Sequence, residues 1–146
     1  MKRKAITIAF IVYVVCVLRI TVFRPGISFR NLFQGTINVS LFKAYLPLLR
    51  EGRWFRIIYL FGGNIVWFVP LGMYLKWLDK WKIRTIAVMG LLFSLFIETM
   101  QYILGTGISE LDDLILNTLG AVIGAWIVGM LRRKIYDRKE TGNAGK

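Results

Sequence analysis

Four apolar segments alternate with polar or basic stretches along the chain and predict four membrane-spanning helices. We expect these helices over residues 5–23, 55–75, 83–104 and 111–131. Each segment is close to the roughly 20 residues that an α-helix needs to cross a bilayer. With 56% hydrophobic residues, the chain is also more apolar than soluble domains usually are. The sequence therefore predicts an all-α integral membrane protein, with one small domain over residues 1–146.

The longest connection covers residues 24–53, between the first and second spans. Arg24, Pro25 and Gly26 indicate a turn at its start. Residues 41–50 are mostly apolar but too few to cross a bilayer, so we expect them to lie along the membrane surface. The predicted fold is thus a four-helix bundle with a long amphipathic outer loop between helices one and two.

The first apolar segment follows three basic residues, which is also how a signal peptide begins. No small-residue cleavage site comes after it, so we expect an uncleaved helix. Arg19 lies in its last turn, where a long basic side chain can reach the membrane interface. We expect Arg19 to be such an anchor, and the alternative is a counter-ion for Glu98.

Composition limits the chemistry that is open to this chain. With Cys16 as the single cysteine, no disulfide can form within the chain. The absence of histidine excludes a His-ligated metal site and a nucleophile that histidine activates. The formal net charge of +12 is compatible with a nucleic-acid partner, but the basic residues cluster at the ends of apolar segments. That placement is typical of membrane orientation, so we expect no nucleic-acid partner.

The distribution of Lys and Arg predicts how the chain crosses the membrane. With both termini in the cytoplasm, most of these residues fall on the inner side, including Lys76, Lys80, Lys82 and Arg84 between the second and third spans. The positive-inside rule favours this orientation. We therefore expect a multi-pass protein of the cell membrane with both termini cytoplasmic.

Polar side chains interrupt the last three apolar segments, most densely over residues 94–117. Taking 1.5 Å per helical residue, Asn64, Glu98 and Asn117 each lie about 9 to 10 Å inside the outer end of their helix. A charged side chain at such depth costs about 2.5 to 3.5 kcal/mol and usually marks a functional site. We therefore expect a polar pocket that opens to the outer face.

Helical spacing predicts that these residues share one face of each helix. Two sets follow the spacing i, i+4, i+7 and i+11, namely Ser94, Glu98, Gln101 and Gly105, and then Asp113, Asn117, Gly120 and Gly124. Gly120 and Gly124 form a G-x-x-x-G pair that lets another helix approach closely. In the second span, Pro70 should bend the helix near Gly72, and a neighbouring helix must then satisfy the freed carbonyl.

Amides and glycines alone would favour a purely structural interpretation, because hydrogen bonds that join membrane helices are worth about 0.6 kcal/mol each. Two neighbouring carboxylates change that interpretation, since they repel each other in a low dielectric. We therefore predict a functional pocket. Its acid and base groups are Glu98 and Asp113, its binding groups are Asn64, Gln101, Asn117, Glu110 and Ser94, and its structural residues are Pro70, Gly72, Gly120 and Gly124.

The predicted pocket is compatible with more than one chemistry. A desolvated carboxylate beside a second one favours its protonated form, so Glu98 could donate a proton or a hydrogen bond with Asp113 as its partner. We expect no cofactor, with a hard cation such as Mg²⁺ or Ca²⁺ as the alternative, because carboxylate and amide oxygens suit such ions. Nucleophilic catalysis has little support, since Ser94 and Ser109 have no histidine base and no obvious lysine partner.

Three polar motifs follow one another in the second half of the chain. They read Asn64-Ile-Val-Trp-Phe-Val-Pro70-Leu-Gly72, Glu98-Thr-Met-Gln101, and Ser109-Glu110-Leu-Asp112-Asp113-Leu-Ile-Leu-Asn117-Thr-Leu-Gly120. In this order they resemble the signature set of the VanZ-like bacterial membrane proteins. The resemblance covers residues 64–124, with a weaker match at Arg30-Asn31-Leu32 that lacks the Pro-Phe of the family motif. Glu110 replaces the usual Asp, and Gly107 stands where many members have Arg.

The resemblance implies a role at the bacterial cell envelope, with some members linked to lowered sensitivity to teicoplanin-type glycopeptide antibiotics. We favour a pocket that binds the headgroup of a membrane lipid or of a lipid-linked cell-wall precursor. The alternatives are an intramembrane enzyme that modifies such a molecule with Glu98 and Asp113, and a small proton-coupled transporter. A homo-oligomer is left open.

Overall fold

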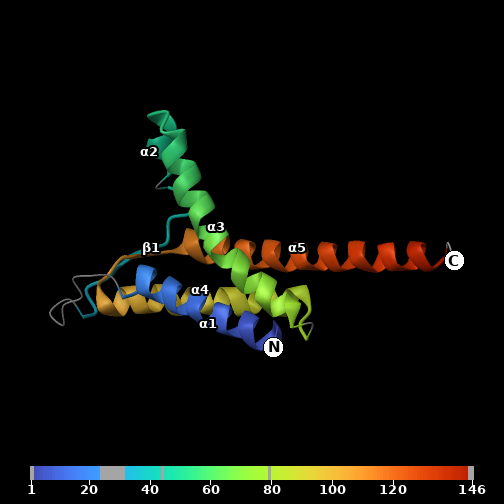
Figure 1. The fold of residues 1–146 in the computed structure, drawn as a ribbon. Coiled ribbons are helices and arrows are strands. Elements are labelled where there is room, and N and C mark those ends of the chain that lie inside the picture. Colours follow the sequence, from blue (N-terminus) through green and yellow to red (C-terminus); the bar gives the residue numbers. More distant parts are fainter. Residues whose placement is uncertain (1, 24–31, 44, 79, 145–146) are drawn as a thin grey trace.

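The computed structural model describes residues 2–23, 32–43, 45–78 and 80–144. Within these ranges, four helices are long and apolar enough to cross a membrane, as the sequence predicts (Figure 1). They are α1 (Lys2–Thr21), α3 (Trp54–Trp77), α4 (Ile83–Leu104) and α5 (Leu111–Ala144). The predicted turn at residues 24–26 and the Arg30-Asn31 part of the loop motif lie outside the described residues.

The observed helix ends follow the predicted spans, except at the end of α5. Residues 83–104 are helical as predicted, whereas α5 continues past residue 131 to Ala144. The basic stretch after residue 131 contains no proline, so nothing in it stops a helix that has already formed. Arg132 in this extension donates from Nη2 to the carbonyl oxygen of Trp77 at 2.7 Å. It thereby satisfies one of the free carbonyls at the end of α3.

The closest packing in the bundle is where α3 crosses α5 (Figure 1). A Cβ atom added at Gly72, Gly120 or Gly124 would lie 1.8, 2.2 or 2.0 Å from a backbone oxygen of the facing helix. Atoms of two residues do not approach so closely, so these positions accept only glycine. The helix that approaches the G-x-x-x-G pair is therefore α3, and α4 packs on another part of α5.

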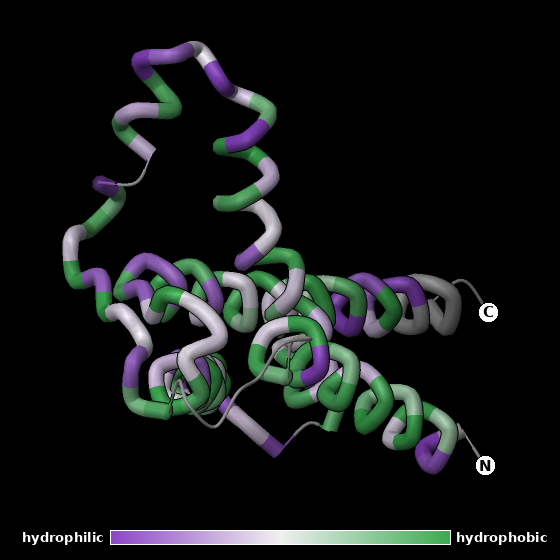
Figure 2. The backbone as a smooth tube through the Cα atoms, turned by 90° about the vertical axis from the view of Figure 1, so that its left-hand side faces the viewer, coloured by the Kyte–Doolittle hydropathy of each residue, from purple (hydrophilic) through white to green (hydrophobic). Residues whose placement is uncertain are grey.

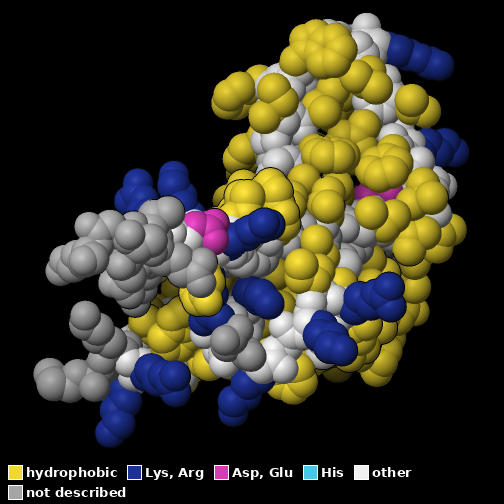
Figure 3. Space-filling model, turned by 90° about the vertical axis from the view of Figure 1, so that its right-hand side faces the viewer, with side chains coloured by type: hydrophobic (Ala, Val, Ile, Leu, Met, Phe, Trp, Pro, Cys, Tyr) yellow, Lys and Arg dark blue, Asp and Glu magenta, His cyan; other side chains and the backbone are white. Residues whose placement is uncertain are grey.

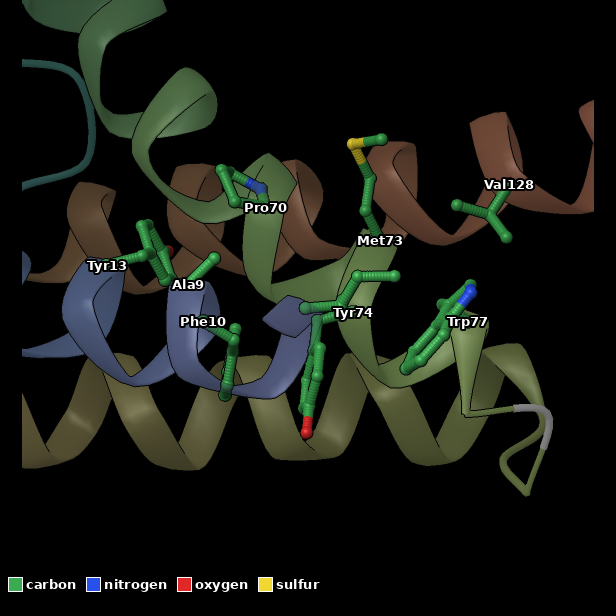
Figure 4. A pocket seen from close by; sticks show the side chains of 9 residues that line it. Ala9, Phe10, Tyr13, Pro70, Met73, Tyr74, Trp77 and Val128 are labelled. Carbon is green, nitrogen blue, oxygen red and sulfur yellow. The ribbon is translucent and has the colours of Figure 1, made fainter. Parts of the chain in front are cut away.

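The helix α1 packs against α3 near Pro70 and leaves an apolar groove of about 350 Å³ between them (Figure 4). The Phe10 and Tyr74 rings stack with their centroids 3.8 Å apart. The Tyr13 hydroxyl donates to the carbonyl oxygen of Trp67. Pro70 leaves the carbonyl four residues before it, that of Val66, without its usual helical donor. Tyr13 on α1 therefore donates to the carbonyl of the next residue, Trp67, and not to the carbonyl that Pro70 frees.

One end of the bundle carries two short strands that the sequence did not predict. Strand β1 (Thr36–Asn38) pairs in parallel with β2 (Ile108–Glu110). The loop before β1 lies on the end of α4, where the Phe33 and Gly35 amides donate to backbone carbonyls of that helix. Three-residue strands are too short to show an alternating pattern, so nothing in the sequence indicated them.

After β1 the chain forms the short helix α2 (Tyr45–Arg50) in the segment expected at the membrane surface. Together with the first turns of α3, it projects from the bundle as an arm (Figure 1 and Figure 2). The opposite end of the bundle, where both described chain ends lie, carries Lys and Arg side chains (Figure 3).

A polar cleft between α3, α4 and α5

A cavity of about 540 Å³ opens at the end of the bundle that carries the strands. It lies between α2, the first half of α3, the end of α4, β2 and the start of α5, and we call it the polar cleft. Its lining is Tyr45, Arg56, Leu60, Asn64, Gln101, Gly107, Ile108, Glu110 and Asp113. Four of the seven predicted acid, base and binding residues line it, namely Asn64, Gln101, Glu110 and Asp113.

The inner part of the polar cleft is formed by a carboxylate and two amides. Asn64 on α3 donates from Nδ2 to Oδ1 of Asp113 on α5. Gln101 on α4 is 7% exposed and donates from Nε2 to the carbonyl oxygen of Thr21 at 3.2 Å. Its Oε1 atom has no hydrogen-bond partner in the described part of the chain. Three helices thus bring polar groups together, although of the three residues expected at one depth only Asn64 lines this cleft.

Arg56 and Tyr45 line the polar cleft, although the sequence did not single them out as site residues. Arg56, Leu60 and Asn64 share one helix face at i, i+4 and i+8, and this spacing is a signal that could have found Arg56. Tyr45 belongs to α2, and only the fold reveals that it faces α5. Burial raises the pKa of the Tyr45 phenol to about 12, and the charges of Asp113, Asp112 and Glu110 add to that shift. The phenol therefore stays neutral at physiological pH.

Glu98 lies close to the polar cleft but lines a different cavity. Its side chain is 5% exposed, and Oε2 accepts the backbone N–H of Glu110 at 2.9 Å. It borders a mostly apolar groove of about 280 Å³ between α4 and the strands, which Glu110 also lines. Glu110, whose amide Glu98 accepts, lies three residues before Asp113 along the chain. The two predicted acid–base residues are therefore neighbours that line separate cavities.

Arg19 does not act as a counter-ion for Glu98 in this structure. Its guanidinium is exposed and donates to the carbonyl oxygen of Phe23, just beyond the end of α1. The two residues form no salt bridge in the described part of the chain. This position agrees with the predicted interfacial anchor.

The loop over residues 38–42 is held by two acids, Glu110 at the end of β2 and Asp112 at the start of α5. Asp112 is 1% exposed and accepts the Phe42 backbone N–H at 2.9 and 3.0 Å. Glu110 accepts a hydrogen bond from Asn38 Nδ2 at 2.9 Å. Asp112 was not predicted as a site residue, because an acid in the first turn of a helix is common whatever its role.

Most of the chain matches one known protein family. The model of the VanZ/LLP1 family matches residues 10–132, which overlap all four spans and include the whole lining of the polar cleft. The chain belongs to the VanZ/LLP1 family. Neither the curated proteins nor the solved structures contain a match to it.

In this VanZ/LLP1 family protein, two predicted binding residues lie outside the polar cleft. Asn117 Nδ2 donates to Ser94 Oγ at 2.8 Å, and Ser94 Oγ donates to the Asp113 carbonyl oxygen at 3.4 Å. Both side chains are buried. The contact therefore joins α4 to α5 beneath the polar cleft.

We predict that Asn117→Ala destabilises the protein modestly and leaves the polar cleft intact. Hydrogen bonds between membrane helices contribute about 0.6 kcal/mol on average and about 1.7 kcal/mol at most. The free energy of unfolding in detergent should fall within that range, and Ser94→Ala should show most of the same loss. The double variant should lose less than the sum, because both changes remove one contact. Strictly additive losses would contradict this assignment.

Proposed function

We propose that this VanZ/LLP1 family protein binds, in the polar cleft, the headgroup of a membrane lipid or of a lipid-linked cell-wall precursor. The observation that carries the proposal is the lining of the cleft. A cation, two carboxylates and two amides meet there at the end of a bundle of membrane-spanning helices. Binding sites fix a ligand with a few such converging polar groups. The cleft opens at one end of the spans, and lipid headgroups lie near the ends of membrane-spanning helices.

The positive-inside rule supports placing the polar cleft at the external face of the cell membrane. The opposite end of the bundle carries the basic turn and the basic extension of α5. A protein that holds headgroups at the external face would reduce the surface supply of molecules that glycopeptide antibiotics capture. This is how we propose that the protein lowers sensitivity to teicoplanin-type antibiotics.

The position of Glu98 favours binding over catalysis. An acid and a base that act on one bond must both reach the reacting group, at about 2.6 to 3.2 Å. Glu98 and Asp113 line separate cavities, and one Glu98 oxygen already accepts the Glu110 amide. An enzyme that uses Glu98 and Asp113 remains the second candidate, because Glu110 borders both cavities.

Teicoplanin sensitivity of cells that express the protein tests this proposal. Asp113→Asn and Arg56→Gln should each remove most of the protection, because each removes a charged group from the cleft. Glu51→Gln and Arg53→Gln are the matched controls, since they change the same charges on an exposed pair outside the cleft. Lipid and wall-precursor profiles should not change on expression. A new lipid or precursor species that disappears with Glu98→Gln would favour the enzyme instead.

A further inference from the structure

Four acidic side chains gather around the polar cleft of this basic protein. The chain has 8 acidic and 20 basic residues, and Glu98, Glu110, Asp112 and Asp113 lie at this one end. None of the four forms a salt bridge with a described Lys or Arg. Arg56 is the one basic residue in the described lining of the cleft. Glu110 and Asp113 therefore give the lining of the cleft one more carboxylate than Arg56 can balance.

Gln101 gives an independent indication that the ligand brings hydrogen-bond donors. It lines the cleft, its side chain is more than nine-tenths buried, and its Oε1 atom lacks a partner among the described residues. A buried carbonyl oxygen without a donor is costly. A positively charged group with N–H bonds would satisfy this oxygen and offset the carboxylates together.

An organic cation fits this arrangement better than a metal ion. Among the described residues, no three acidic, cysteine or histidine side chains converge closely enough to hold a metal. The carboxylates lie on separate elements, with Glu110 on β2 and Asp113 on α5. A metal ion needs ligands at one point, whereas an ammonium group on a longer molecule can reach acceptors on different walls.

We infer that the headgroup bound in the polar cleft carries a primary ammonium group beside a phosphate, an inference that rests on the proposed function. The ammonium donates to Asp113 and to Gln101 Oε1 in the inner part of the cleft. Arg56 lies about two helical turns before Asn64 on α3, toward the arm, and faces the phosphate. Phosphatidylethanolamine and amine-bearing wall precursors share this chemistry.

Lipid retention by purified protein tests the inference. The full-length protein is reconstituted in phosphatidylglycerol nanodiscs with a small fixed fraction of phosphatidylethanolamine or phosphatidylcholine, and native mass spectrometry measures which lipid stays bound. Phosphatidylethanolamine should be enriched at least about tenfold, because hydrogen bonds to charged groups are strong. Phosphatidylcholine carries the charge without N–H donors, so it should show little enrichment. A further experiment replaces phosphatidylethanolamine with an amine-bearing lipid-linked precursor. Stronger retention of this precursor would show that the bound ammonium group belongs to a wall precursor.

Variants separate this inference from the proposed function. Asp113→Asn keeps the oxygen that accepts from Asn64, so it should fold and lose the preference for phosphatidylethanolamine. Glu110→Gln should lower the preference in the same direction, and Glu51→Gln should not. Arg56→Gln should weaken retention of phosphatidylglycerol, phosphatidylethanolamine and phosphatidylcholine alike, because all three carry a phosphate. Equal retention of the three lipids, still weakened by Arg56→Gln, would overturn the ammonium and leave headgroup binding. If no cleft variant changes lipid retention, both the ammonium preference and headgroup binding in the polar cleft would be overturned.

Discussion

Gly72→Ala is expected to disrupt the bundle, although it adds a single methyl group. The new Cβ would lie 1.8 Å from the carbonyl oxygen of Ala121 on α5 and 2.6 Å from its carbonyl carbon. These are backbone atoms, so no side-chain rotation can relieve the overlap. Overpacking usually costs about 1 to 3 kcal/mol, and we expect a loss at or above that range because the two helices must separate. The free energy of unfolding in detergent measures the loss.

Glycines elsewhere on the same helices provide matched controls. Gly62 on α3 and Gly129 on α5 have no neighbouring atom within 4 Å of an added Cβ. Alanine there should leave stability unchanged or raise it by about 0.5 to 1 kcal/mol, because glycine is unfavourable within a helix. Destabilisation of the same size in all three variants would show that the α3–α5 contact does not explain the effect.

The four spans could be predicted because the bilayer fixes both their length and their composition. The end of α5 could not, since a basic tail without a proline gives no signal for where a helix stops once the apolar pattern ends. The strands β1 and β2 were missed for a related reason. Residues 36–38 pair with residues 108–110 because the loop before β1 lies on the end of α4. This contact joins distant parts of the chain, so no local sequence pattern indicates it.

The site was partly predictable for the same physical reasons. Helical spacing and depth identify which residues share a level, and Asn64, one of those residues, lies against Asp113. They do not fix how far each helix is rotated relative to its neighbours. That rotation directs Glu98 toward β2, places Asn117 against Ser94, and brings Arg56 into the polar cleft. Close packing at Gly72, Gly120 and Gly124 sets the crossing of α3 over α5, which positions Arg56.

Asp112→Ala is expected to release the loop over residues 38–42, which precedes Tyr45 in the lining of the polar cleft. Both carboxylate oxygens of Asp112 accept the Phe42 amide, and Phe42 has a positive φ of 52°, which a bulky residue rarely adopts. Losing a hydrogen bond to a charged group costs about 1.5 to 3 kcal/mol. Without it, the strained turn can relax and carry Tyr45, three residues later, away from the cleft.

Hydrogen exchange distinguishes release of this loop from unfolding of the whole protein. In Asp112→Ala, exchange of the amides at residues 36–42 should accelerate about tenfold or more, whereas amides within α3 and α5 should stay protected, because the glycine contacts between those helices are unchanged. Glu51→Ala, in the exposed turn after α2, should leave both regions as they are. Because Tyr45 leaves with the loop, lipid retention should fall together with the protection at Phe42. Full protection at Phe42 in Asp112→Ala would mean that β1 alone holds the loop, and Asp112 would then have no positioning role.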